Sequence, residues 1–257
     1  MNTDSLRLAA ASLRKARSVV VITGAGISAE SGLRTFRGGE KDMSSLWKEF
    51  DPQTLATPEA FDANPETVTR WYDWRRQGCL AAEPNPGHLA LAEIERRLKT
   101  RGTFTLLTQN VDRLHQKAGS SNVVELHGSI IQWRCTECGD KLTPAPEPFD
   151  AFPPPAACCV GALLRPDVVW FGEALPFDAL RAADQAVADC DLFFSIGTSS
   201  VVYPAAAYVH AAAQRGATTI EINKDPTPIT SRVTHSLQGR AGEVLPQLVA
   251  AAFGTAN

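Results

Sequence analysis

A glycine-containing turn near the start of the chain has the spacing of a phosphate-binding loop. Gly24, Gly26 and Ala29 follow the β-branched run at residues 19–23 and match the pattern G-x-G-x-x-G/A. Glycine lets the backbone approach a pyrophosphate, and the helix that follows presents unpaired amides to it. The sequence therefore predicts dinucleotide binding, whereas the plain alternative is a tight turn without a ligand. The residues expected at the dinucleotide here are Gly24, Ala25, Gly26 and Ser28.

The pattern of a hydride-transferring dehydrogenase does not continue beyond this turn. Such an enzyme has a second strand that ends about 20 residues later in an acidic residue, which binds the ribose. Asp42 and Glu49 lie at about that distance, but no strand-like run precedes either of them. We therefore expect the nicotinamide end of a dinucleotide to be handled in another way.

Polar residues that could do chemistry follow the strand-like runs at residues 105–108 and 122–126. They are Gln109, Asn110, Asp112 and His127. Ligands of open α/β sheets lie at the carboxyl ends of the strands, so these side chains are expected beside the glycine turn. Amides can hold ribose hydroxyls, a carboxylate can hold a carboxamide, and a histidine can act as a base near neutral pH. The alternative is ordinary capping of strand ends.

Two later runs, at residues 192–196 and 218–222, end in a similar way. The residues that follow them are Gly197, Thr198, Ser199 and Asn223. They could reach the adenosine half of a dinucleotide, although turn and capping chemistry is also common for Ser, Thr and Asn.

Four of the six cysteines are close in sequence: Cys135, Cys138, Cys158 and Cys159. The Cys135-x-x-Cys138 pair is a good half of a structural zinc site. Cys158 and Cys159 are adjacent, and neighbours in an extended chain point to opposite sides, so both could bind one tetrahedral ion only if the backbone bends. A four-cysteine zinc site and a lost or weak site both remain open. Cys79 and Cys190 are interpreted as packing residues.

Tyr72 and Arg75 lie three residues apart in an aromatic stretch at residues 71–76 and would share one face of a helix. A guanidinium beside a phenol is a good receptor for a carboxylate. The alternative is a helix that packs Trp71 and Trp74 inward and leaves Arg75 and Arg76 in solvent.

Composition limits the class of protein. The chain has 257 residues, 44% of them hydrophobic, and a net charge of −3, which argues against nucleic acid or an anionic membrane as the main partner. No apolar run approaches the ~18 residues that span a bilayer, and the first residues do not resemble a signal peptide. Cysteines in such a chain indicate metal binding or catalysis rather than disulfides, and the expected compartment is the cytoplasm.

The chemistry-bearing residues require alternating strands and helices to position them. Apolar runs at residues 19–23, 105–108, 122–126, 167–171, 192–196 and 218–222 suit parallel strands buried on both faces. Helical patterns fall at residues 6–17, 88–99, 178–189, 205–214 and 244–253. This alternation predicts an α/β fold with a doubly wound, Rossmann-like parallel sheet.

Two segments break the alternation. We expect residues 38–87 to form a helical insert and residues 129–165 to form a cysteine/zinc module with little regular structure, the two together making a smaller lobe. The larger lobe would comprise residues 1–37, 88–128 and 166–257, within a single catalytic domain at 1–257.

Taken in order, these motifs resemble those of the sirtuins, NAD-dependent protein-lysine deacylases. The matching segments are Gly24-Ala25-Gly26-Ile27-Ser28, Ser31-Gly32, Phe36-Arg37, Thr108-Gln109-Asn110-Val111-Asp112, Leu114-His115, His127-Gly128, Val168-Val169-Trp170-Phe171-Gly172-Glu173 and Gly197-Thr198-Ser199. The resemblance covers almost the whole chain, from about Val19 to Pro246. It implies cleavage of the nicotinamide–ribose bond of NAD and transfer of the lysine's acyl group to ADP-ribose. Nicotinamide and O-acyl-ADP-ribose would be released.

The resemblance also implies a role for each matched position. His127 would be the general base that activates a ribose hydroxyl, and Asn110 would orient the ribose or a water. Asp112 with Val111 would hold the nicotinamide carboxamide, Phe36 would shield the reacting face, and Arg37 would contact phosphate. Residues Ala25, Gln109, Ser199, Asn223 and Ala241 would line the rest of the NAD site.

Substrate selection is implied in the same way. The segment from Val168 to Glu173, with Val169, Trp170, Phe171 and Gly172 inside it, would pair with the substrate peptide as an added strand. Tyr72 and Arg75 resemble the pair of the desuccinylase-type (class III) branch, which binds acidic acyl groups such as succinyl, malonyl or glutaryl. Arg34, where most other branches have proline, fits the same branch.

The expected partners are acylated-lysine proteins or peptides, and the expected state is a monomer. The alternatives are a deacetylase proper or a mono-ADP-ribosyl transferase on the same fold. A zinc-ribbon module that binds nucleic acid is a third, disfavoured by the negative charge.

Overall fold

The computed structural model describes residues 3–33 and 52–254, and in that part of the chain the strands form two sheets. The larger sheet has six strands in the order β3-β2-β1-β7-β8-β9, all paired in parallel. Their bounds are β1 Ser18–Thr23, β2 Thr103–Thr108, β3 Val123–Glu125, β7 Leu192–Ile196, β8 Thr218–Asn223 and β9 His235–Gln238. An order that reverses at the first strand is that of a doubly wound sheet, as the sequence predicts.

Burial on both faces explains the continuous apolar runs. On β1, Val19 and Val21 belong to one core cluster, whereas Val20 and Ile22 belong to another. Because successive side chains of a strand point to opposite faces, a strand covered on both sides must be apolar at every position.

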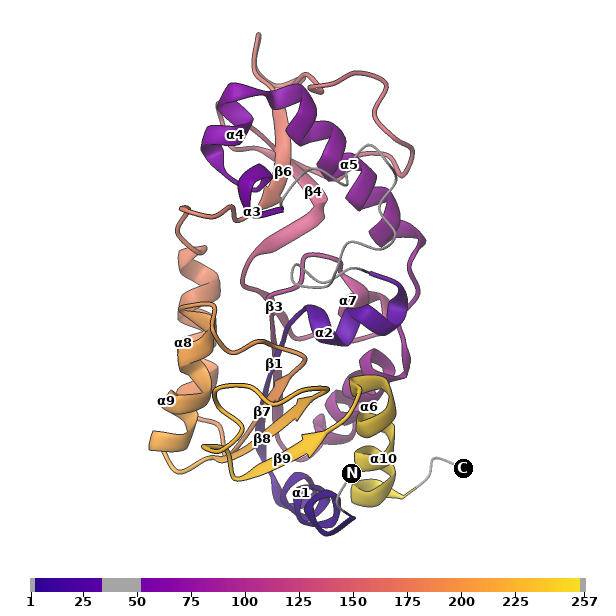
Figure 1. Cartoon of the computed structure of the whole chain (residues 1–257), viewed down its shortest axis with the longest axis vertical. Coiled ribbons are helices and arrows are strands. Elements are labelled where there is room, and N and C mark those ends of the chain that lie inside the picture. The colour runs from indigo at the N-terminus through magenta and orange to yellow at the C-terminus, as the bar shows by residue number, and fades with distance from the viewer. Residues whose placement is uncertain (1–2, 34–51, 255–257) are drawn as a thin grey trace.

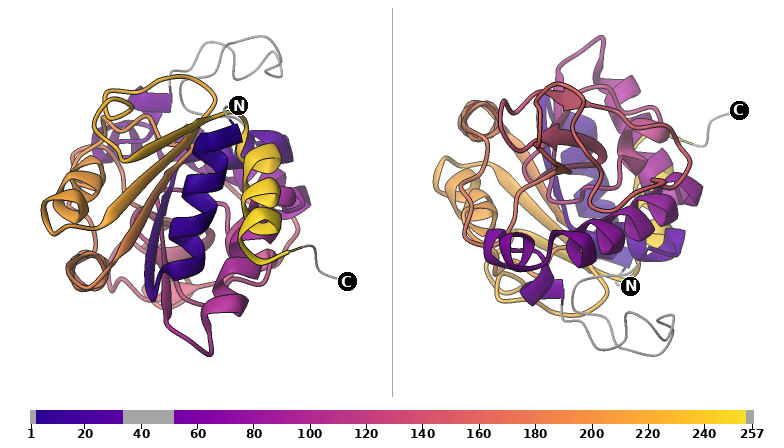
Figure 2. Two further views of the ribbon diagram at one scale, coloured as in Figure 1. Left: turned by 90° about the horizontal axis from the view of Figure 1, so that it is seen from below. Right: turned by 90° about the horizontal axis from the view of Figure 1, so that it is seen from above.

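Helices cover each face of this sheet, as Figures 1 and 2 show. On one face lie α1 (Thr3–Lys15), α6 (Pro86–Leu98) and α10 (Ala241–Phe253), whose buried side chains share a cluster with Val19 and Val21. On the other face lie α8 (Phe177–Ala188) and α9 (Tyr208–Gln214), preceded by the 3₁₀ turn η2 (Ala205–Ala207).

The second sheet is small and antiparallel, in the order β5-β4-β6, with bounds β4 Gly128–Cys135, β5 Lys141–Leu142 and β6 Leu164–Val168. It packs with α4 (Pro58–Ala63) and α5 (Pro65–Ala81), which follow the short α3 (Pro52–Leu55), at the top of Figure 1. Phe61, Val68 and Trp71 from the helices and Ile130 and Trp133 from β4 form its core.

Two expectations about strands were wrong. The run at residues 167–171 is not a strand of the parallel sheet, because β6 ends at Val168 and pairs antiparallel with β4. Val168 and Trp170 are buried in the second cluster with residues of α4 and α5, whereas Phe171 is 48% exposed. An apolar run packed partly against helices thus leaves the same sequence signal as a strand covered on both faces. Strand β9 was not expected, since its sequence, His235 to Gln238, is mostly polar and only Leu237 is buried.

Candidate active site

The glycine turn connects β1 to the short helix α2 (Ala25–Ser28), which continues into the 3₁₀ turn η1 (Ala29–Ser31). The amides of Gly24 and Gly26 donate hydrogen bonds to the carbonyls of Ile196 and Gly197, at 3.0 and 2.9 Å. A Cβ on Gly24 would lie 2.8 Å from the Gly197 oxygen, and one on Gly26 would lie 2.7 Å from the Gly197 Cα. The turn after β1 packs so closely against the turn after β7 that both positions require glycine, with or without a bound ligand.

A buried network joins this turn to the end of β2. The side-chain amide of Asn110 (Nδ2) donates to the Gly24 carbonyl at 3.1 Å and to Ser28 Oγ at 3.0 Å. Ser28 Oγ in turn donates to Asp112 Oδ2 at 2.7 Å. Asp112 Oδ1 accepts from the Leu114 amide, which opens α7 (Leu114–Lys117). Burial raises the pKa of Asp112. The structure thus brings together three of the polar residues that the sequence singled out.

His127 follows β3 and is held by one hydrogen bond. Its Nδ1 lies 3.0 Å from the carbonyl oxygen of Gln109. A carbonyl only accepts, so Nδ1 carries the proton and Nε2 keeps a free lone pair. Burial lowers the pKa of His127, against the raising effect of the Gln109 bond, so the ring is neutral at pH 7. A neutral imidazole with a fixed tautomer is the form required of a general base.

Two further histidines lie behind the network, and their position was not predicted. His115 Nε2 lies 2.9 Å from Thr23 Oγ1, His88 Nε2 lies 3.4 Å from Ser28 Oγ, and the two ring centroids are 4.9 Å apart. Burial lowers the pKa of His88 to about 4 and that of His115 to about 3. The sequence signal for His88 was only its place in the first turn of a helix, where it completes a capping box with Asn85.

The predicted adenosine-binding residues lie at the ends of β7 and β8. The Asn223 amide donates to the Thr198 carbonyl at 2.8 Å, and Thr198 Oγ1 accepts from the Ser200 amide at 2.8 Å. These hydrogen bonds stabilise the turns that follow β7 and β8. Asn223 and Thr198 therefore have a structural role in addition to any contact with a ligand. Ser199 lies between Thr198 and Ser200 in the turn after β7. Ala241, which is buried, is the first residue of α10. Phe36 and Arg37 lie outside the described residues.

Tyr72 and Arg75 share one face of α5, which begins after the cap Asn64 and the first-turn Pro65. Tyr72 is 2% exposed, and burial raises its pKa to about 12, so the phenol keeps its proton. The Arg75 guanidinium lies 5.7 Å from the Tyr72 ring centroid and 4.6 Å from that of Trp71. The positive charge of Arg75 also acts to lower the pKa of Asp112, against the larger raising effect of burial.

The alternative interpretation of this helix was wrong on two points. Trp74 is 40% exposed rather than packed inward, and Arg76 is 1% exposed rather than solvated. Arg76 pairs with Asp73 at 2.7 Å and donates to the carbonyls of Ala145 and Glu147.

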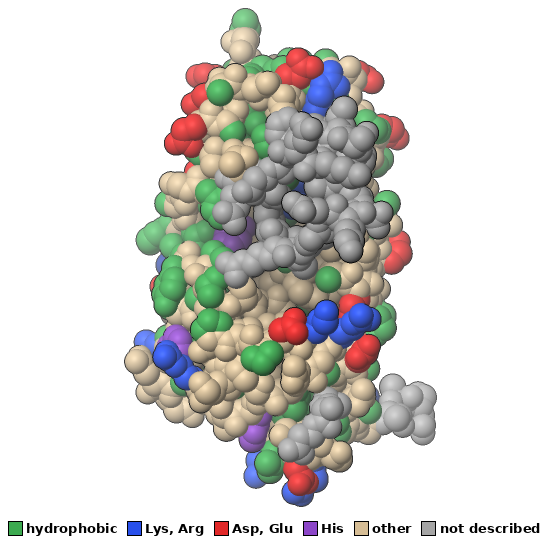
Figure 3. All heavy atoms as spheres, viewed as in Figure 1, with side chains coloured by type: hydrophobic (Ala, Val, Ile, Leu, Met, Phe, Trp, Pro, Cys, Tyr) green, Lys and Arg blue, Asp and Glu red, His purple; other side chains and the backbone are tan. Residues whose placement is uncertain are grey.

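The segment after β6 already uses several of its own amides. The amides of Val169 and Phe171 donate to the carbonyls of His127 and Ala56, and the Trp170 amide donates to Glu173 Oε2. Phe171 is 48% exposed, and Gly172 is exposed with a φ of +87°, a conformation that favours glycine. Figure 3 shows hydrophobic side chains gathered beside the start of α8, on the left of the molecule.

The four clustered cysteines converge in space. The Sγ atoms of Cys135, Cys138, Cys158 and Cys159 all lie within 4.8 Å of one another. The backbone bends at residues 157–159, and this bend lets two adjacent residues reach one centre. Hydrogen bonds among the thiols, first that with Cys138, raise the pKa of Cys158 to about 12. The set fits Zn²⁺, which binds four thiolates tetrahedrally at about 2.3 Å.

Comparisons with known proteins agree with this geometry. Residues 24–204 match the model of the Sir2 family. An "NAD-dependent protein deacylase 2" from Pyrobaculum aerophilum is 51% identical over 92% of this chain and 92% of its own. The mitochondrial "NAD-dependent protein deacylase sirtuin-5" of Canis lupus familiaris is 44% identical over 92% of this chain and 82% of its own.

A solved structure gives the same result for the fold. The crystal structure of a Sir2 homologue in complex with NAD has a TM-score of 0.85 and 43% sequence identity, covering 98% of this chain and 94% of that one.

In the part of the chain that is described here, every helix is too short or too polar to cross a membrane.

Proposed function

The chain belongs to the Sir2 family and is an NAD-dependent protein deacylase; from this premise we propose that it favours lysines that carry acidic acyl groups. Succinyl, malonyl and glutaryl lysine each bring a carboxylate into the site. The observation that supports the proposal is Arg75, which lies beside the protonated phenol of Tyr72 on one face of α5.

The electrostatics of this pair suit a carboxylate. A charged acyl chain that entered the buried surroundings of Tyr72 without a partner would lose its hydration. Arg75 supplies the opposite charge, and the Tyr72 hydroxyl, which keeps its proton, supplies a second hydrogen-bond donor. An acetyl group has no charge to pair, so the same residues give it little.

The remaining residues are assigned to the reaction as follows. Bound NAD supplies an electrophilic ribose carbon and nicotinamide as the leaving group. His127 Nε2 accepts a proton from a ribose hydroxyl, since Nδ1 is already bonded to Gln109. Asn110, held by Gly24 and Ser28, orients the ribose or a water, and Asp112 holds the carboxamide together with Val111.

The rest of the NAD site follows the same assignment. The phosphates are assigned to the glycine turn and Arg37, and Phe36 is assigned to shield the reacting face. Ala25, Gln109, Ser199, Asn223 and Ala241 are assigned to the remaining NAD site. Residues Val169 to Gly172 bind the substrate peptide. The amides of residues 169–171 are already hydrogen-bonded within the protein, so the peptide bonds to Gly172 and to the backbone carbonyls of this segment.

The cysteine cluster is assigned a structural zinc ion, because four thiolates leave no open position for a substrate. The larger lobe carries the NAD site, and the smaller lobe, residues 38–87 and 129–165, carries the zinc ion and the acyl pair. We place the enzyme in the cytoplasm as a monomer that acts on acylated proteins or peptides rather than on nucleic acid or membranes. Six unpaired cysteines are typical of a reducing compartment.

A peptide panel tests the acyl preference. One peptide is prepared with acetyl-, succinyl-, malonyl- or glutaryl-lysine and incubated with enzyme and NAD, and the products are followed by mass spectrometry. We expect kcat/KM for the acidic acyls to exceed that for acetyl. Faster removal of acetyl would make the enzyme a deacetylase proper, and transfer of ADP-ribose to protein would indicate a transferase.

Variants of the pair test the residues. Arg75→Met should lower kcat/KM for succinyl-lysine by roughly thirty- to several-thousandfold, mainly through KM, because removal of one partner of a buried pair costs about 2–5 kcal/mol. Acetyl-lysine should be cleaved about as well as before or better. Tyr72→Phe should act in the same direction but more weakly, since it loses one hydrogen bond and no charge. Equal loss of both activities would assign the pair to the fold instead.

A further inference from the structure

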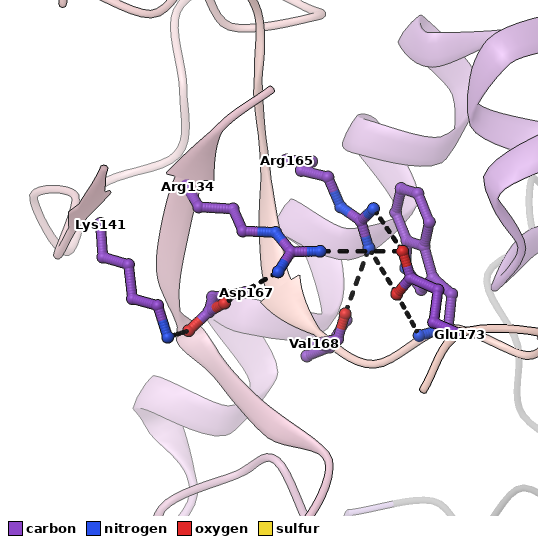
Figure 4. A network of polar contacts seen from close by, with 7 residues as sticks. Arg134, Lys141, Arg165, Asp167, Val168 and Glu173 are labelled. Carbon is purple, nitrogen blue, oxygen red and sulfur yellow. Dashed lines mark hydrogen bonds and ion pairs between the residues drawn. The ribbon is translucent and has the colours of Figure 1, made fainter. Parts of the chain in front are cut away.

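Arg165 and Glu173 form a two-pronged ion pair beneath the segment that follows β6, shown in Figure 4. Arg165 Nη1 and Nη2 donate to Glu173 Oε1 and Oε2 at 2.7 and 3.0 Å. Their side chains are only 11% and 22% exposed. Partial burial works to raise the pKa of Glu173, but the hydrogen bonds from Arg165 and the Trp170 amide, together with the charges of Arg165 and Arg134, lower that pKa on balance, so the pair is ionised at pH 7. Pairs with this geometry are among the stronger ones.

The same two side chains hold the backbone between them. Arg165 Nη2 donates to the Val168 carbonyl at 3.2 Å, and Glu173 Oε2 accepts from the Trp170 amide at 2.8 Å. The Glu173 amide in turn donates to the Trp170 carbonyl at 3.0 Å. Both ends of the segment assigned to the substrate chain are therefore tied to one ion pair.

Arg165 also fixes a ring that reaches the acyl pair. Its guanidinium carbon lies 3.3 Å from the centroid of the Trp170 ring. Trp170 is 2% exposed, and its ring centroid lies 6.2 Å from that of Tyr72 and 5.3 Å from that of Phe61. Packing and the stacked guanidinium thus set the angle of the ring.

We propose that Arg165 and Glu173 are a positioning pair that fixes the substrate-binding backbone at residues 168–173 and, through Trp170, the Tyr72 side of the acyl pocket. Neither residue needs to touch the reacting atoms. The inference rests on the proposed function, because it takes residues 168–173 as the peptide site and Tyr72 as an acyl contact. It adds that peptide binding and acyl choice are set by one ion pair.

The test compares Arg165→Gln, Arg165→Lys and Glu173→Gln with wild type, using acetyl- and succinyl-lysine peptides. We expect Arg165→Gln to raise the peptide KM about ten- to a hundredfold, with kcat at saturating peptide and the Kd of NAD changed about threefold or less, because preorganisation is lost and the chemistry is not. Arg165→Lys should recover only part of the peptide affinity, since an ammonium lacks the planar fork and the stack. The succinyl-to-acetyl ratio should fall in Arg165→Gln.

Arg134→Gln is the matched control. Arg134 reaches Glu173 and Asp167 at 3.7 Å each, so it has the same charge and the same neighbourhood. Its loss should leave peptide KM within about twofold, as is usual for a loose, partly exposed pair.

Several results would overturn the proposal. They are an unchanged peptide KM in Arg165→Gln, an equal loss of NAD affinity, an equal effect of Arg134→Gln, and failure of all three pair variants to fold. The acetyl peptide keeps this test separate from the acidic-acyl proposal. A wild-type enzyme without acidic preference defeats that proposal alone, while the acetyl KM still reports on the positioning pair.

Discussion

At His127, one hydrogen bond decides which nitrogen can act as a base. The Gln109 carbonyl holds the proton on Nδ1, and burial keeps the ring neutral by lowering its pKa. Gln109 thereby has a role through its backbone, which no sequence pattern reveals. The residue types around the turn were readable from the sequence, but the tautomer follows only from the three-dimensional contact.

We expect His127→Ala to lower deacylation by roughly 10²–10⁴-fold, the usual contribution of a general base, while NAD binding measured by calorimetry persists. In the wild type, the depressed pKa should keep the base unprotonated below pH 6.5, so the acid limb of kcat/KM should lie below that pH. Activity of His127→Ala within a few-fold of wild type would remove His127 from this role. The half-buried His210 on α9 provides the control variant, His210→Ala, which should retain full activity.

At the scale of elements, α5 has two functions on two faces. Tyr72 and Arg75 form the proposed acyl pair, whereas Asp73 and Arg76 hold the loop at residues 144–150. Arg76 donates to the Ala145 and Glu147 carbonyls, and Asp73 accepts from the Phe149 amide. One helix therefore ties the proline-rich loop to the acyl pair.

We expect Arg76→Met to lower the free energy of unfolding by about 3–5 kcal/mol, because it leaves the buried Asp73 carboxylate without an opposite charge, with only the Phe149 amide still bonded to it. Arg70→Met on the same helix is the matched control. Arg70 pairs with Glu66 at 2.9 Å, but both side chains are about half exposed, so its loss should cost at most about 1 kcal/mol. Urea titrations measure both variants. Similar costs for the two would show that burial does not distinguish these pairs.

The cysteine cluster joins the end of β4 to the bend before β6, next to the strand pairing of Cys135 with Leu164. If Cys135, Cys138, Cys158 and Cys159 hold one zinc ion, purified protein should contain about one equivalent by elemental analysis. Chelation should lower the thermal midpoint, and Cys138→Ser should do the same. Cys190→Ser, a change at a buried cysteine outside the cluster, should leave the zinc content unchanged. Metal-free protein of unchanged stability would contradict the assignment.

For the whole molecule, the sequence predicts a strand correctly where an apolar run has one structural explanation. It misleads where burial in a parallel sheet and burial against helices produce the same apolar run. The run from Val19 to Thr23 suits a strand buried on both faces, and β1 is one. The run at residues 167–171 is also apolar, but β6 ends at Val168, and the buried Val168 and Trp170 pack with residues of α4 and α5. The alternative interpretation of α5 leaves Arg76 in solvent, because the sequence does not show that a loop 69 residues away covers it. The bend that brings Cys158 and Cys159 to one centre is likewise a property of the folded chain.

The buried histidines give a prediction for global stability. His88 and His115 are 0% and 1% exposed, with pKa values lowered to about 4 and about 3, against about 6.5 in an unfolded chain. Below pH 6.5 the unfolded state therefore binds protons that the folded state does not. Stability should be complete above that pH and fall as the pH drops toward 4, by up to about 1.4 kcal/mol per pH unit for each histidine. Urea titrations between pH 7.5 and 4.5 give the slope.

The variant His115→Gln isolates this effect from other titrating groups. Its amide can still bond to Thr23, but it cannot take up a proton, so about half of the histidine contribution to the slope should vanish whatever the variant costs at pH 7.5. Burial raises the pKa of Asp112, so its contribution to the stability of the protein has the opposite sign and is lost as the pH rises. Asp112 is present in both proteins, so its contribution cancels in the comparison. A slope unchanged by His115→Gln would mean that the acid sensitivity of the fold arises elsewhere than in the buried pair.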